Sequence, residues 1–181
     1  MQDHCDAVAP LVALLQELGE VVQHLSSRQY VQKPVGVVES SIGGHVRHCL
    51  DHVSALISAI DLGTLDYEHR LRGTPIETSR IAAIEAIDDL IAHLQSLGEI
   101  DLDQLLYMRA LMCASGPAMT VRTSVGRELA YVLAHTIHHN ALIGAMVKTL
   151  GGWLPERFGY APSTVRHLEA KAVTLEAACA R

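Results

Sequence analysis

Eleven histidines stand out in this chain of 181 residues, and six of them fall into two short segments at helical spacing. The segment HTIHH places His135 and His139 four residues apart, which is about 40° around a helix axis. Both imidazoles therefore project from one face, one turn apart, and can offer two nitrogens to a single ion. His138 lies on the other flank, where it cannot easily share that ion.

The second segment, GGHVRHCLDH, sets His45, His48 and His52 along one stripe of a helix. One helix cannot surround an ion, so we expect this stripe to face the pair formed by His135 and His139. Three neutral imidazoles leave coordination positions open for water or substrate, which is typical of catalytic rather than structural zinc sites. The two segments together predict one mononuclear metal site with an open side.

Three further side chains could take part in acid–base chemistry near such a site. Glu77 follows the loop RLRGTPI, although helix capping explains it without chemistry. Glu128 lies seven residues before His135 on nearly the same face, where it could accept from a ligand, bind the ion as a fourth ligand, or pair with an arginine such as Arg127 or Arg122. Tyr131 lies near this face and could donate to an oxyanion, with core packing as the simpler interpretation.

The spacing of apolar residues predicts the helices that must position these groups. The expected helices cover residues 5–27, 40–63, 74–97, 124–150 and a last segment from 163 toward the C-terminus. Ser40 or Ser41 and Ser124 are expected helix caps, and Thr74-Pro75-Ile76-Glu77 reads as a capping box with proline at the first helical position. Residues 100–123 differ, because two apolar or β-branched runs flank Ser115-Gly116-Pro117. This pattern predicts a short β-hairpin.

Composition indicates one globular domain over residues 1–181, with 49% hydrophobic and 19% charged residues. Aromatic residues make up only 4%, which favours an all-α fold. The formal net charge of -6 and the absence of adjacent Lys or Arg residues argue against nucleic acid as a partner. No apolar run approaches the roughly 20 residues of a membrane span. Scattered cysteines and the lack of a signal-peptide pattern predict a cytoplasmic protein.

The motifs SIGGHVRHCLDH and HTIHHNALIG resemble the DinB-like superfamily, which includes the DinB and YfiT proteins, over about residues 8–167. The resemblance implies an up-down four-helix bundle with a single divalent metal. Carried over to this chain, the ligands are His48, His135 and His139. His45 and His52 are then expected to line the pocket or to orient a ligand, and His138 to lie beside them. The hairpin at 100–123 and the C-terminal helix are additions to the common core.

The resemblance also implies a class of function. The expected ion is one of Zn, Ni, Fe, Co or Mn, all of which accept imidazole. The expected protein is a homodimeric, metal-dependent hydrolase or thiol-dependent transferase that acts on a small-molecule substrate, with a thiol as one candidate. One alternative is a metal-binding or interaction module without turnover. Another is a hemerythrin-like di-iron protein, which the lack of any Glu-x-x-His motif disfavours.

Overall fold

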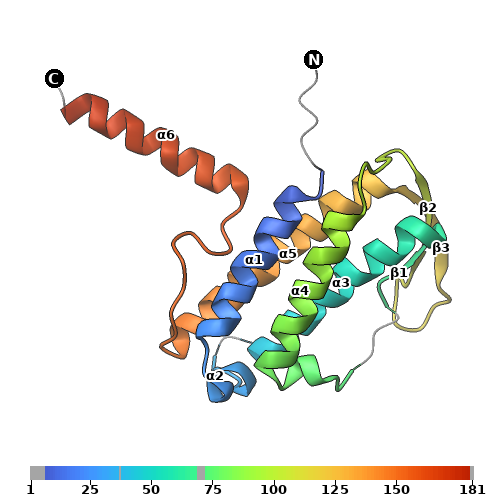
Figure 1. The fold of residues 1–181 in the computed structure, drawn as a ribbon, viewed down its shortest axis with the longest axis horizontal. Coiled ribbons are helices and arrows are strands. Elements are labelled where there is room, and N and C mark those ends of the chain that lie inside the picture. The colour runs from blue at the N-terminus through green and yellow to red at the C-terminus, as the bar shows by residue number, and fades with distance from the viewer. Residues whose placement is uncertain (1–6, 37, 69–71, 180–181) are drawn as a thin grey trace.

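Four helices enclose the main hydrophobic core of the protein (Figure 1). The computed structural model describes residues 7–36, 38–68 and 72–179. The core helices are α1 (Ala9–His24), α3 (Ile42–Leu62), α4 (Arg80–Ser96) and α5 (Val125–Thr149). Helices α1 and α3 each pack against both α4 and α5, which buries the apolar face of each helix. The predicted helix-rich fold is confirmed, while the predicted start of the first helix at residue 5 lies outside the described residues.

Three of these helices have a serine at the N-cap, whose hydroxyl accepts a hydrogen bond from a backbone N–H of the first turn. Ser41 caps α3 and Ser124 caps α5, as predicted. The predicted capping box at Thr74–Glu77 is wrong, because Thr74 makes no side-chain cap and Pro75–Glu77 forms a separate 3-10 turn, η1. Helix α4 begins later, after Ser79, whose hydroxyl accepts from the N–H of Ala82 at 3.3 Å.

A three-stranded mixed sheet lies beside one end of the helices, so the prediction of an all-α chain was incomplete (Figure 1). Strands β2 (Leu105–Ala110) and β3 (Met119–Ser124) form the predicted antiparallel hairpin. Strand β1 (Thr64–Asp66) pairs in parallel with β2 and was not predicted. Three residues are too few to show the alternation of apolar and polar side chains that identifies a strand.

A second, small core holds this sheet against the helices. It contains Ala59 of α3, Leu65 of β1, Leu106 of β2 and Val125 of α5. The amide of Gln104 also donates to the carbonyl of Ile60 at 2.7 Å, which ties the start of the hairpin to the end of α3. Because β3 runs directly into α5, the hairpin is held next to the two helices that carry the histidines.

The two remaining helices lie outside the main core. Helix α2 (Ser27–Val31) is a single short turn that follows α1. Helix α6 (Pro162–Cys179) begins one residue before the predicted position and extends away from the other helices (Figure 1). Its described side chains, over residues 162–171, are almost all exposed. In the described part of the chain, no helix is long and apolar enough to cross a membrane.

Candidate metal centre

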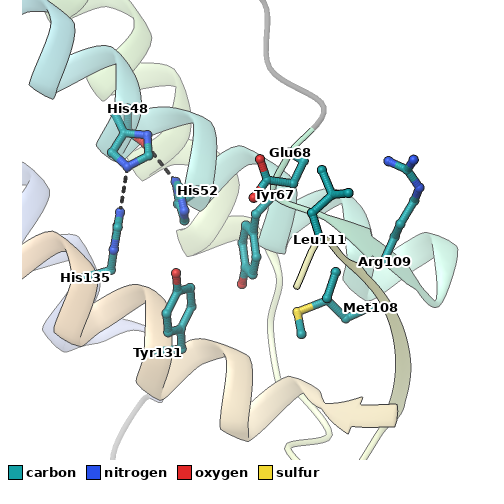
Figure 2. A pocket seen from close by; sticks show the side chains of 10 residues that line it. His48, His52, Tyr67, Glu68, Met108, Arg109, Leu111, Tyr131 and His135 are labelled. Carbon is teal, nitrogen blue, oxygen red and sulfur yellow. Dashed lines mark hydrogen bonds between the residues drawn. The ribbon is translucent and has the colours of Figure 1, made fainter. Parts of the chain in front are cut away.

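His48 of α3 and His135 of α5 meet across the interface of these two helices (Figure 2). Their Nε2 atoms lie 3.1 Å apart, and their rings cross at 70°. Two imidazole nitrogens that each bind one zinc-like ion at about 2.0–2.1 Å, at angles near 90–110°, lie roughly 3.0–3.4 Å apart. The observed separation is that of an N–H···N hydrogen bond between the two imidazoles, and it also falls in the range for two ligands of one ion.

His52 lies one turn further along α3 and is buried, with only 4% of its surface exposed. Its Nδ1 donates to the backbone carbonyl of His48 at 3.0 Å, so its Nε2 carries the lone pair. The nearest ligand atoms of His48, His52 and His135 all lie within 4.8 Å of one another. The ring of His52 stacks on that of His135, with centroids 4.1 Å apart and planes inclined at 22°.

His139, also buried, completes the cluster on the other side of His48. Its ring centroid lies 4.7 Å from that of His48 and 4.5 Å from that of His135, at inclinations of 74° and 54°. Its Nδ1 lies 3.0 Å from Nδ1 of His45. Burial lowers the pKa of His139 to about 3, with a further contribution from the charges of the neighbouring histidines, His135 first. The imidazole is therefore neutral near pH 7, as a metal ligand must be.

The remaining histidines of the two segments lie at the edge of this cluster. Burial, followed by the charge of His138, lowers the pKa of His45. His138 is exposed on the outer flank of α5, as its helical position predicted, and its ring is nearly perpendicular to that of His139. The stripe on α3 and the pair on α5 thus face each other, with His138 outside.

A pocket of about 300 Å³ opens beside the histidines (Figure 2). Histidines 48, 52 and 135 form one side of it, and the hairpin contributes Met108, Arg109 and Leu111 on another. The phenol oxygen of Tyr131 points toward the histidines (Figure 2). Sequence reasoning missed the pocket residues of the sheet, because the hairpin's contact with α3 and α5 leaves no local pattern in its own residues.

Glu128, one of the acid–base candidates, belongs to a buried hydrogen-bond network instead. Its side chain has no exposed surface. It accepts from the hydroxyls of Tyr67 at 2.9 Å and Thr123 at 2.7 Å, and from Arg127 at 2.7 Å. Burial and the Glu128 carboxylate raise the pKa of Tyr67 well above its ordinary value. The predicted pairing of Glu128 with a neighbouring arginine is confirmed, and the network joins the sheet to α5.

Glu77 also has structural partners. Its Oε1 lies 2.8 Å from Nε of Arg47 and accepts from the N–H of Gly73 at 2.8 Å. Arg47 in turn pairs with Asp51 on the same helix. Glu77 does not line the histidine pocket, so of the three acid–base candidates only Tyr131 does.

Comparison with known proteins places these features in a family. The family model of the DinB superfamily matches residues 11–143. Over 106 residues the chain is 39% identical to FK506-binding protein 5 of the fungus Rhizopus delemar. That match covers 58% of this chain but only 28% of the relative's length. A DinB-like protein from Bacillus subtilis has a similar solved structure, with a TM-score of 0.62 and 19% identity over 85% of this chain and 99% of that one. This last likeness is one of fold.

Proposed function

Since this chain belongs to the DinB superfamily, we propose that it is a metal-dependent protein whose single divalent ion is held by His48, His135 and His139. The observation that carries the proposal is the 3.1 Å separation of the Nε2 atoms of His48 and His135 at the edge of a pocket. The donor set also fits such an ion, because several imidazoles from α3 and α5 gather here. Within the described residues, the group of ligand atoms close enough to share an ion comes from His48, His52 and His135, without His139 and without any carboxylate, which argues against a di-iron site.

Ring orientation favours His139 over His52 as the third ligand. The lone pair of a ligating imidazole lies in the ring plane and must point at the ion. The rings of His52 and His135 are stacked and nearly parallel, so the in-plane lone pairs of these two rings do not converge on one point. The rings of His48, His135 and His139 are inclined to one another by 54° to 74°, so their planes can converge on one point.

The pocket supports a catalytic role for this site. A bound divalent ion would polarise a substrate carbonyl or lower the pKa of a water or thiol. The chain itself supplies the hydroxyl of Tyr131 as a hydrogen-bond donor to a substrate oxygen, and Met108 and Leu111 as an apolar wall. A pocket of about 300 Å³ suits a small molecule. The proposed reaction is either hydrolysis of a small-molecule substrate or a group transfer that uses a thiol.

Metal analysis of the purified protein tests the proposal. We expect close to one Zn, Ni, Fe, Co or Mn ion per chain, and loss of that ion in the His135→Ala/His139→Ala double variant. His138→Ala is the matched control, since it removes an exposed histidine from the same helix. Equal metal content in the wild type and the double variant would refute the site.

A metal-binding module without turnover is the second candidate, and one observation favours it. Glu77 pairs with Arg47, and Glu128 accepts from Tyr67, Thr123 and Arg127, so neither of these two glutamates lines the histidine pocket. Glu68 does line the pocket, so this observation favours the module only in part. A panel of hydrolysis and thiol-transfer assays on the metal-loaded protein separates the candidates. Turnover that disappears in Tyr131→Phe supports the enzyme, and full metal content without any turnover supports the module.

The proposed assembly is a homodimer, in line with the expectation from the family. Light scattering on the eluting protein checks it, and a mass equal to one chain of 19.6 kDa contradicts it.

A further inference from the structure

The contact between His45 and His139 joins a proposed ligand to a histidine that is not among the three proposed ligands. The two Nδ1 atoms lie 3.0 Å apart, and the ring centroids 5.2 Å apart. His45 is the first histidine of the α3 stripe, and His139 is the last of the α5 segment. At this distance one Nδ1 carries a proton that it donates to the other.

The direction of that hydrogen bond decides whether His139 can be a ligand. If His45 donates, Nδ1 of His139 accepts, and the proton of neutral His139 must sit on Nε2. If His139 donates, its Nε2 holds the lone pair that an ion requires. Ligating histidines almost always donate their second ring N–H to an acceptor, which fixes both the tautomer and the orientation of the ring.

We propose that His45 is a positioning residue for the metal site, which accepts a hydrogen bond from Nδ1–H of His139 and so directs Nε2 of His139 toward the ion. The inference rests on the proposed function, since it requires His139 to be a ligand. In most metal sites a carboxylate or a backbone carbonyl accepts the second N–H of a ligating histidine. Here the acceptor would be an imidazole on the facing helix.

In this arrangement the proton of His45 lies on its other nitrogen, Nε2. Nε2 of His45 is buried and has no hydrogen-bond partner in the described part of the chain. No described group therefore fixes which nitrogen of His45 carries the proton, and the contact with His139 is left to decide it. An unpaired buried N–H carries a desolvation cost, so we expect His45 to accept at Nδ1 only when an ion bound at Nε2 of His139 offsets that cost.

The neighbouring histidine His52 shows the contrasting case. Its Nδ1 donates to the carbonyl of His48, four residues earlier on the same helix. That bond is local to α3 and forms wherever the helix forms. The bond between His45 and His139 spans α3 and α5, so it exists only when the two helices are correctly packed. His45 thereby couples the orientation of one ligand to the docking of the helix that supplies another, His48.

The test uses the full chain loaded with Co²⁺, whose paramagnetism shifts the N–H protons of ligating imidazoles away from all other proton resonances. The variants are His45→Ala, which removes the acceptor, and His45→Asn, whose Oδ1 can replace Nδ1 as acceptor. His138→Ala is the control. Thermal melts followed by circular dichroism show that each variant is folded before it is compared.

We expect His45→Ala to weaken Co²⁺ binding by about 10–100-fold in competition with a chelator, as loss of such a partner typically does. The N–H proton of His139 should then exchange rapidly with water, so that its shifted resonance broadens beyond detection. His45→Asn should restore much of the affinity and that resonance, and His138→Ala should change neither.

Two results would overturn the inference while leaving the metal site intact. One is a His45→Ala protein that binds Co²⁺ with unchanged affinity and all shifted N–H resonances. The other is loss of a whole ligand from the cobalt absorption spectrum in both His45 variants, since this would make His45 itself a ligand. A folded wild-type protein that binds no Co²⁺ would instead refute the proposed function, and this inference with it.

Discussion

Replacement of Glu128 by glutamine separates a structural role of this residue from a catalytic one. The carboxylate is fully buried and accepts from Tyr67, Thr123 and Arg127. Hydrogen bonds to a charged acceptor contribute about 1.5–3 kcal/mol each, and neutral ones about 1 kcal/mol. The two bonds from hydroxyls therefore lose about 2 kcal/mol together in Glu128→Gln. The side chain of Arg127 is 59% exposed, so its ion pair adds only about 0–1 kcal/mol.

Glu128→Ala should cost more, because it leaves the hydroxyls of Tyr67 and Thr123 without their acceptor. Each buried, unpaired hydroxyl costs about 1–3 kcal/mol, so we expect a loss of about 4 kcal/mol. Urea unfolding measures both variants, with a chelator present so that metal binding adds nothing to the stability. Glu85→Gln on the exposed face of α4 is the control and should change the stability by less than about 0.5 kcal/mol.

Metal content and stability together give the result that would refute this reasoning. The network predicts that Glu128→Gln is less stable but still binds one metal ion. A variant as stable as Glu85→Gln would show that the three hydrogen bonds contribute nothing. A variant of wild-type stability that loses its metal or its turnover would show that Glu128 acts at the metal site instead.

Three further predictions follow from the site. First, His52→Ala should keep its metal while His139→Ala loses it, as measured by metal analysis; the reverse result would make His52 the third ligand. Second, the metal-free protein should lose stability as the pH falls from about 6.5 toward 3, because the unfolded chain takes up a proton that His139, with its lowered pKa, does not. Urea unfolding at several pH values should show a shallower dependence in His139→Gln, and an unchanged slope would contradict the assignment. Third, Met108→Trp should fill part of the pocket, so azide should perturb the cobalt absorption spectrum more weakly while metal content stays the same; wild-type azide affinity would show that the hairpin does not limit access.

The hairpin gives this protein a feature beyond its four core helices. Strands β2 and β3 bring Met108, Arg109 and Leu111 to the pocket, while Arg109 pairs with Asp66 of β1 at 3.0 Å. Glu128 and Tyr67 tie the same sheet to α5. The wall that the hairpin forms at the pocket is therefore held in place by the network around Glu128.

Much of the site could be predicted because helical spacing is a local property. The four-residue step between His135 and His139 places both imidazoles on one face wherever α5 forms, since a helix has about 3.6 residues per turn. The stripe of His45, His48 and His52 follows in the same way from α3. Caps at Ser41 and Ser124 depend only on the first turn of each helix.

At Thr74–Glu77 the tertiary structure overrides the local sequence pattern. The four residues match a capping box, but Glu77 turns to Arg47 of α3 and α4 begins after Ser79. The backbone of Glu77 also packs directly against Gly43, where a Cβ atom would collide with its carbonyl oxygen. An ion pair and a close approach between distant segments thus outweighed a local capping signal of about 1 kcal/mol.

The sequence by itself determined that two histidine-bearing helix faces exist and that together they could hold an ion. Only the tertiary structure decided which nitrogens meet: Nε2 of His48 with Nε2 of His135, and Nδ1 of His45 with Nδ1 of His139. The reason is that the relative height and rotation of α3 and α5 depend on how the side chains of the whole core pack. A shift of one turn would exchange the partners along the stripe while leaving every local pattern in the sequence unchanged.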